Sequence, residues 1–95
     1  MNQMIGKKSR ISSRFLIGSV VKNTLDEDLG EIEEMLVDPE TGFVSEVVLS
    51  TTKFLGLGKR IAVPWDMLKI DDQAPSPIMD IDKDFLARVP SYRGS

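Results

Sequence analysis

Apolar and polar residues alternate in short runs along most of this chain. From Phe15 onward, turn-forming stretches such as DPETG and DDQAPSP recur every 8 to 12 residues, and the runs between them are rich in β-branched and aromatic residues. This spacing is typical of an all-β barrel or sandwich. We therefore expect five or six strands, within residues 19–22, 31–37, 43–50, 60–65, 67–70 and 78–81.

The clearest hairpin signal is the turn sequence DPETG at residues 38–42. Asp38 can cap the turn, Pro39 presets its own φ, and Gly42 can adopt a positive φ without steric cost. The turn predicts an antiparallel hairpin between residues 30–37 and 43–50.

Both faces of the second hairpin strand carry apolar side chains. Strict alternation places Phe43, Val47 and Leu49 on one face, and Val44 and Val48 on the other. A barrel core on the first face and an external contact on the second would explain this pattern. Val44 and Val48 are therefore candidates for a partner interface.

The run RIAVPW at residues 60–65 also alternates. It directs Ile61, Val63 and Trp65 inward, so Trp65 is better explained as a core anchor than as a stacking surface for a base or a ring. Pro64 has no N–H group, and we expect it at a sheet edge or where the strand ends.

One short helix is expected at residues 82–89. Asp82 is suited to be its N-cap. Three apolar side chains would then fold back onto the barrel: Phe85, Leu86 and Val89.

The stretch FLGLG at residues 54–58 is the most apolar loop of the chain. Gly56 and Gly58 allow a tight bend, while Phe54, Leu55 and Leu57 either cover one end of the barrel or contact a partner. The sequence leaves these two functions of the loop open.

Two motifs hint at ligands but do not meet the chemical requirements. GLGK at residues 56–59 lacks the following Ser or Thr, the upstream glycine and the helix of a phosphate-binding loop. Asp80, Asp82 and Asp84 have the first spacings of a calcium loop, but Phe85 replaces the turn glycine and no acid stands at the twelfth position.

Composition argues against catalysis. The 95 residues suffice for one domain with a thin core, 41% of them are hydrophobic, and His and Cys are both absent. Carboxylates such as Glu33, Glu34 and Glu46 could meet across the hairpin, without forming a recognisable catalytic set. No apolar run is long enough to span a membrane, and the first ten residues lack the apolar segment of a signal peptide, so we expect neither feature. We expect a cytoplasmic, non-enzymatic protein without a metal or cofactor.

Charge divides the chain into a basic end and an acidic body. Residues 1–14 contain no acid, whereas the remainder holds 8 basic and 15 acidic side chains. We expect a flexible tail at residues 1–14, a domain at residues 15–90 and a flexible tail at residues 91–95. The acidic run at residues 26–28, followed by Gly30, predicts a solvated turn. The N-terminal tail offers candidate contacts to nucleic acid or an anionic surface: Lys7, Lys8, Arg10 and Arg14.

Several of these stretches, taken in order, resemble the PRC-barrel family. They are GSVV at residues 18–21, LGEI at 29–32, DPETG at 38–42, FLGLG at 54–58, AVPW at 62–65 and DIDK at 80–83. The resemblance covers about residues 15–90 and implies a small six-stranded β-barrel with a binding role and no catalytic apparatus. Family members include the cytoplasmic part of the photosynthetic reaction-centre H subunit, a domain of a ribosome maturation factor, and small stand-alone proteins. Because only a short basic tail precedes Phe15, the stand-alone class matches best.

These observations predict an all-β, six-stranded PRC-like barrel with one short C-terminal helix. As its function we expect protein–protein contact and assembly, most simply as a homodimer through residues 54–57 and a neighbouring strand edge. Two alternatives remain: a factor in RNA metabolism or ribosome maturation, and a soluble relative of the reaction-centre subunit.

Overall fold

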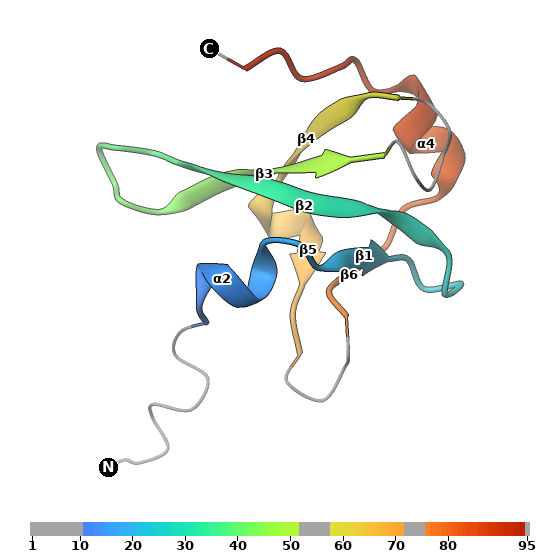
Figure 1. Ribbon diagram of the computed structural model, residues 1–95, viewed down its shortest axis with the longest axis horizontal. Helices are drawn as coiled ribbons and strands as arrows, with labels where there is room; N and C mark the ends of the chain where they lie inside the picture. The colour runs from blue at the N-terminus through green and yellow to red at the C-terminus, as the bar shows by residue number, and fades with distance from the viewer. Residues whose placement is uncertain (1–10, 52–57, 72–75, 95) are drawn as a thin grey trace.

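The six expected strands form a single sheet. The computed structural model describes residues 11–51, 58–71 and 76–94. Within them the strand order is β4-β3-β2-β1-β6-β5 (Figure 1). The strands are β1 (Val20–Lys22), β2 (Asp28–Val37), β3 (Val44–Ser50), β4 (Arg60–Pro64), β5 (Leu68–Lys69) and β6 (Ile78–Met79).

The predicted hairpin forms the centre of the sheet. β2 and β3 are antiparallel, with Ile32 opposite Leu49 and Val37 opposite Val44. The turn between them is built as expected: Asp38 Oδ1 accepts a hydrogen bond from the Glu40 N–H at 2.9 Å, and the φ of Gly42 is +79°. This turn chemistry fixes the register of the two longest strands.

The sheet curves like a barrel but does not close. β1 pairs with β6 in parallel, and every other strand pair is antiparallel. β4 and β5 end the strand order, and the short 3-10 helix η1 (Trp65–Met67) connects them along the chain. The expected barrel is therefore confirmed in strand number and curvature, with an open sheet.

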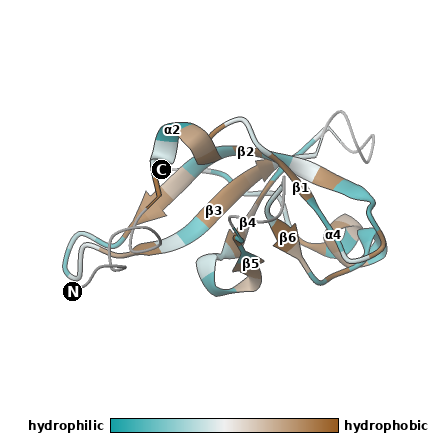
Figure 2. Cartoon of the chain, turned by 90° about the horizontal axis from the view of Figure 1, so that it is seen from below, coloured by the Kyte–Doolittle hydropathy of each residue, from teal (hydrophilic) through white to brown (hydrophobic). Residues whose placement is uncertain are grey.

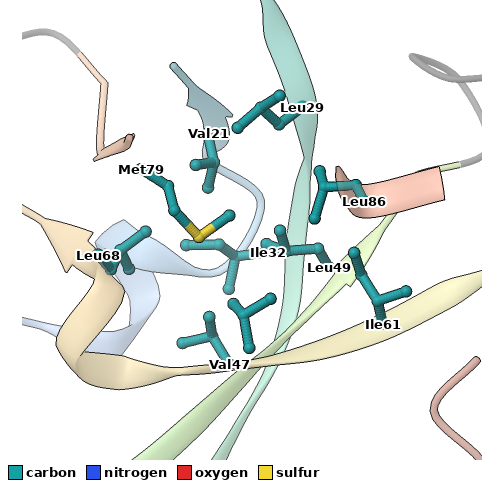
Figure 3. Close-up of a cluster of buried hydrophobic side chains, with 10 residues drawn as sticks. Val21, Leu29, Ile32, Val47, Leu49, Ile61, Leu68, Met79 and Leu86 are labelled. Carbon is teal, nitrogen blue, oxygen red and sulfur yellow. The ribbon is translucent and has the colours of Figure 1, made fainter. Parts of the chain in front are cut away.

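The core lies on the concave side of this sheet. Figure 3 shows side chains from β1, β2, β3, β4, β5, β6 and the C-terminal helix pointing toward one another. Ile61 and Val63 belong to this core, as the alternation predicted. Trp65 also packs against it, although it begins η1 instead of extending β4, which ends at Pro64.

Within the part of the chain that the structure describes, two short helices flank the sheet, where one was expected. The predicted helix is α4 (Lys83–Arg88): Asp82 Oδ1 caps it by accepting from the Phe85 N–H at 2.8 Å, and Leu86 is fully buried. Phe85 does not fold back onto the core as expected but is 43% exposed, because the face that buries Leu86 turns its neighbour outward. The additional helix is α2 (Ser13–Leu16).

Helices α2 and α4 lie at different places on the sheet. In Figure 2, α2 lies above β2, while β5, β6 and α4 lie below it. Figure 1 shows α4 at the opposite end of the long axis from the tip of the β2–β3 hairpin. Among the described residues, no helix has the length and apolarity to cross a membrane.

Candidate functional site

Among the described residues, five of the seven exposed large apolar side chains lie in one half of the molecule, and the other two, Leu25 and Phe85, lie elsewhere. Phe43 is 74% exposed, Phe15 59% and Val37 56%, and Ile11 and Ile17 are also exposed. They belong to α2 and its flanks or to the tip of the β2–β3 hairpin. In Figures 1 and 2 the tip forms one end of the long axis, and α2 lies between the tip and the middle of the molecule. We call these five residues the apolar end. Exposed apolar groups gathered in this way are typical of an interaction surface.

Helix α2 is fixed to the sheet by its buried side and its backbone. Leu16 is fully buried, so Phe15 and Ile17 on either side of it must turn toward solvent. The Gly18 N–H donates to the Ile32 carbonyl at 2.8 Å, and Ser19 Oγ donates to the Phe15 carbonyl at 2.8 Å. Phe15 and Ile17 are therefore held outward by the packing of the residue between them.

The hairpin tip presents its apolar residues for another reason. The register shifts between Leu36 and Val37, so strict alternation along β3 breaks near its start. Phe43 precedes β3, and its carbonyl accepts from the Asp38 N–H at 2.8 Å. The expectation that Phe43 shares the core face with Val47 is therefore wrong.

The predicted interface residues differ in whether the structure describes them and in how exposed they are. Phe54, Leu55, Gly56 and Leu57 lie outside the described residues, which resume at Gly58 with a φ of +63°. On β3, Val44 is half-buried, but Val48 is fully buried. We withdraw Val48 as an interface residue, because a partner cannot reach it.

A second cluster, made of charged side chains, connects β4 to β2. Arg60 reaches from β4 across β3: its Nε lies 2.8 Å from Glu33 Oε1, and its Nη2 contacts Glu34 Oε2. The hydrogen bond that Arg60 donates to Glu33 is the main cause that raises the pKa of Arg60. Of the three carboxylates that were expected to meet, Glu33 and Glu34 do so, and both bind the Arg60 guanidinium. Glu46 lies in another part of the ladder, opposite Leu36.

The chain after α4 is attached to β4 at this cluster. The Tyr92 N–H donates to the Arg60 carbonyl at 2.7 Å, and the Tyr92 ring centre lies 5.7 Å from the Arg60 guanidinium carbon. Lys59 Nζ donates to the carbonyls of Ala87 and Val89 and so caps the C-terminal end of α4. These contacts cover part of the outer edge of β4. A terminal strand otherwise exposes the unpaired N–H and C=O groups of this edge.

The acidic turn between β1 and β2 is tightly organised. Asn23 is buried, and its Oδ1 accepts from the N–H groups of Leu25 and Glu27, each at 3.0 Å. Asp28 lies 2.6 Å from Lys22 Nζ and, as the leading cause, raises the pKa of Lys22. The run is a structural turn, and Asn23 is the organising residue that the sequence reading missed.

The remaining candidate ligand residues have structural partners or lie apart. Asp82 is occupied as the cap of α4, and Asp80 Oδ1 accepts from Thr24 Oγ1 at 3.4 Å. The described residues include no group of three or more acidic side chains arranged to hold a metal ion. Of the predicted basic contacts, Arg14 is exposed on α2, and the others lie outside the described residues: Lys7, Lys8 and Arg10.

No curated protein matches the chain. The family model of the PRC-barrel domain matches residues 11–86, which include all six strands and most of α4. The same stretch contains the turn at residues 38–42 and the strand that ends at Pro64, both of which carried the resemblance in the sequence. This chain therefore belongs to the PRC-barrel domain family.

Proposed function

We propose that this domain is a non-enzymatic module that binds another protein through the apolar end. The observation that carries the proposal is the exposure of two phenylalanines, Phe15 and Phe43, on elements whose backbones are fixed by hydrogen bonds to the sheet. Aromatic anchors held on a rigid support are typical of binding surfaces, because little conformational freedom is lost when a partner covers them.

The ion pairs on the rest of the surface support the same proposal. Arg60 joins Glu33 and Glu34, and Lys22 joins Asp28, so these charges are used within the domain. The apolar end combines aromatic area with only a few charged neighbours, as the central part of a protein interface does. The predicted loop at residues 54–57 remains a second candidate surface.

The proposal is tested by removing the anchors without disturbing the core. Phe15→Ser and Phe43→Ser should fold normally, because both side chains are mainly exposed. We expect the double variant to lose self-association, measured by light scattering, and to lose partners captured from a lysate of the native host. Phe85→Ser is the matched control, since Phe85 is also exposed but lies on α4 at the opposite end.

Equal association of the wild type and the double variant in both assays would overturn the proposal. The loop is tested separately by Leu55→Asp with Leu57→Asp. A loss of association in that variant alone would assign the binding surface to the loop and not to the apolar end.

A further inference from the structure

Basic and acidic residues lie in separate segments of the chain, and the two parts of the apolar end, α2 and the hairpin tip, belong to different segments. Residues 1–22 contain Lys7, Lys8, Arg10, Arg14 and Lys22 and no acid. Residues 23–52 contain nine acids and no Lys or Arg: Asp26, Glu27, Asp28, Glu31, Glu33, Glu34, Asp38, Glu40 and Glu46. Helix α2 therefore belongs to a basic segment, and the β2–β3 hairpin belongs to an acidic one.

The two halves of the apolar end, α2 and the hairpin tip, each lie next to a charged side chain, and these two charges have opposite signs. On α2, exposed Arg14 stands beside Phe15; at the hairpin tip, exposed Glu40 stands in the turn between Val37 and Phe43. Within the described part of the chain, neither Arg14 nor Glu40 forms an ion pair. Each half thus presents aromatic surface with an unused charge that the other half could match.

We propose that the occupant of the apolar end is a second copy of this chain. Helix α2 of one copy contacts the hairpin tip of the other, with Phe15 against Phe43 and Arg14 against Glu40. This inference rests on the proposed function and names its partner. The complementarity lies between two surfaces of one sequence, so a second copy supplies both the apolar and the charged match.

The position of the two halves favours a closed dimer. Both lie in the same half of the long axis, so a twofold axis that passes between them lets α2 of each copy contact the hairpin tip of its partner (Figures 1 and 2). The contact between α2 and the tip is then made twice, once on each side of the axis, and no surface is left to bind a third copy. A dimer is expected, not a filament.

A charge swap tests the pairing. Arg14→Glu and Glu40→Arg each place like charges together at both symmetric contacts, and each should raise the dimer dissociation constant about tenfold. The combined variant exchanges the charges and should return the constant to near the wild-type value. The dissociation constant is measured by sedimentation equilibrium at low salt, and circular dichroism checks the fold of every variant. Arg88→Glu on α4 is the control and should leave the dimer dissociation constant unchanged.

Recovery in the combined variant would establish the pairing, since only a direct contact predicts it. A monomeric wild type at high micromolar concentration, a larger oligomer, or single variants that dimerise normally would each overturn the inference. If the wild type is monomeric but captures a different protein through Phe15 and Phe43, the second-copy inference fails while the proposed function stands. If neither association depends on these phenylalanines, both fail.

Discussion

Gly30 and Gly42 show two different physical reasons for glycine in this sheet. Gly42 has a φ of +79° and open space around its missing side chain, so its backbone conformation requires glycine. Gly30 is buried in β2, where an added Cβ would lie 3.0 Å from the Ser50 carbonyl oxygen and 3.3 Å from Leu49 Cβ. Residue 30 must be glycine because β3 approaches it too closely for a side chain.

Gly30→Ala should therefore destabilise the fold by about 1–3 kcal/mol, because the atom that it meets first belongs to the backbone of the central hairpin. The free energy of unfolding is measured by urea denaturation followed through the fluorescence of Trp65. Glu31→Ala, at the next position of the same strand, is the control and should cost less. Equal midpoints for Gly30→Ala and the wild type would show that β2 and β3 can move apart at this point.

At the scale of elements, local signals in the sequence predicted most of the sheet. The turn at residues 38–42 and the proline that ends β4 depend on residue types with fixed backbone preferences. The N-cap of α4 is equally local, since Asp82 binds an N–H three residues away. Such signals survive in a single sequence because the interacting atoms are neighbours along the chain.

The elements and faces that were missed depend on distant or irregular contacts. Helix α2 is only four residues long, and it is fixed by the burial of Leu16 and by a bond from Gly18 to Ile32. Phe43 was assigned to the core face because a regular alternation was assumed, whereas the register shifts beside Val37. The apolar end exists because of both features, the short helix α2 and the irregular register beside Val37. Periodicity could not have revealed it.

Lys59 shows how a long-range contact completes an element. Its ammonium group, 28 and 30 residues before its two acceptors, supplies hydrogen bonds to carbonyls at the C-terminal end of α4, where the helix dipole also favours a cation. Lys59→Met keeps an unbranched side chain, one atom shorter, and removes the donor. We expect a loss of roughly 1 kcal/mol in unfolding free energy, since the site is partly exposed.

The local effect of Lys59→Met is measured by hydrogen exchange of the α4 amides, which should become faster, while the amides of β2 and β3 change little. Lys69→Met on β5 serves as the control because Lys69 is exposed. A uniform change across the sheet would mean that Lys59 acts on the fold as a whole and does not cap the helix.

At the scale of the whole molecule, the open sheet depends on contacts that cross several strands. β4 is a terminal strand, and its outer edge is limited by Pro64, which has no N–H, and by the hydrogen bond from Tyr92. The Arg60 side chain connects β4 to β2 across β3 and also stacks with Tyr92. One side chain thus joins β4, β2 and the C-terminal segment.

Replacement of Arg60 should therefore weaken both the sheet and its C-terminal cover. In Arg60→Met, Glu33 and Glu34 lose their shared cation, so we expect a lower urea midpoint and faster exchange of the Tyr92 amide. Arg60→Lys should restore little, because a single ammonium group cannot reproduce contacts made through two guanidinium nitrogens and a planar face. Lys69→Met, at an exposed position of β5, should leave both measurements unchanged. If Arg60→Lys matches the wild type, positive charge alone suffices and the geometry of the guanidinium has no special part in holding the sheet together.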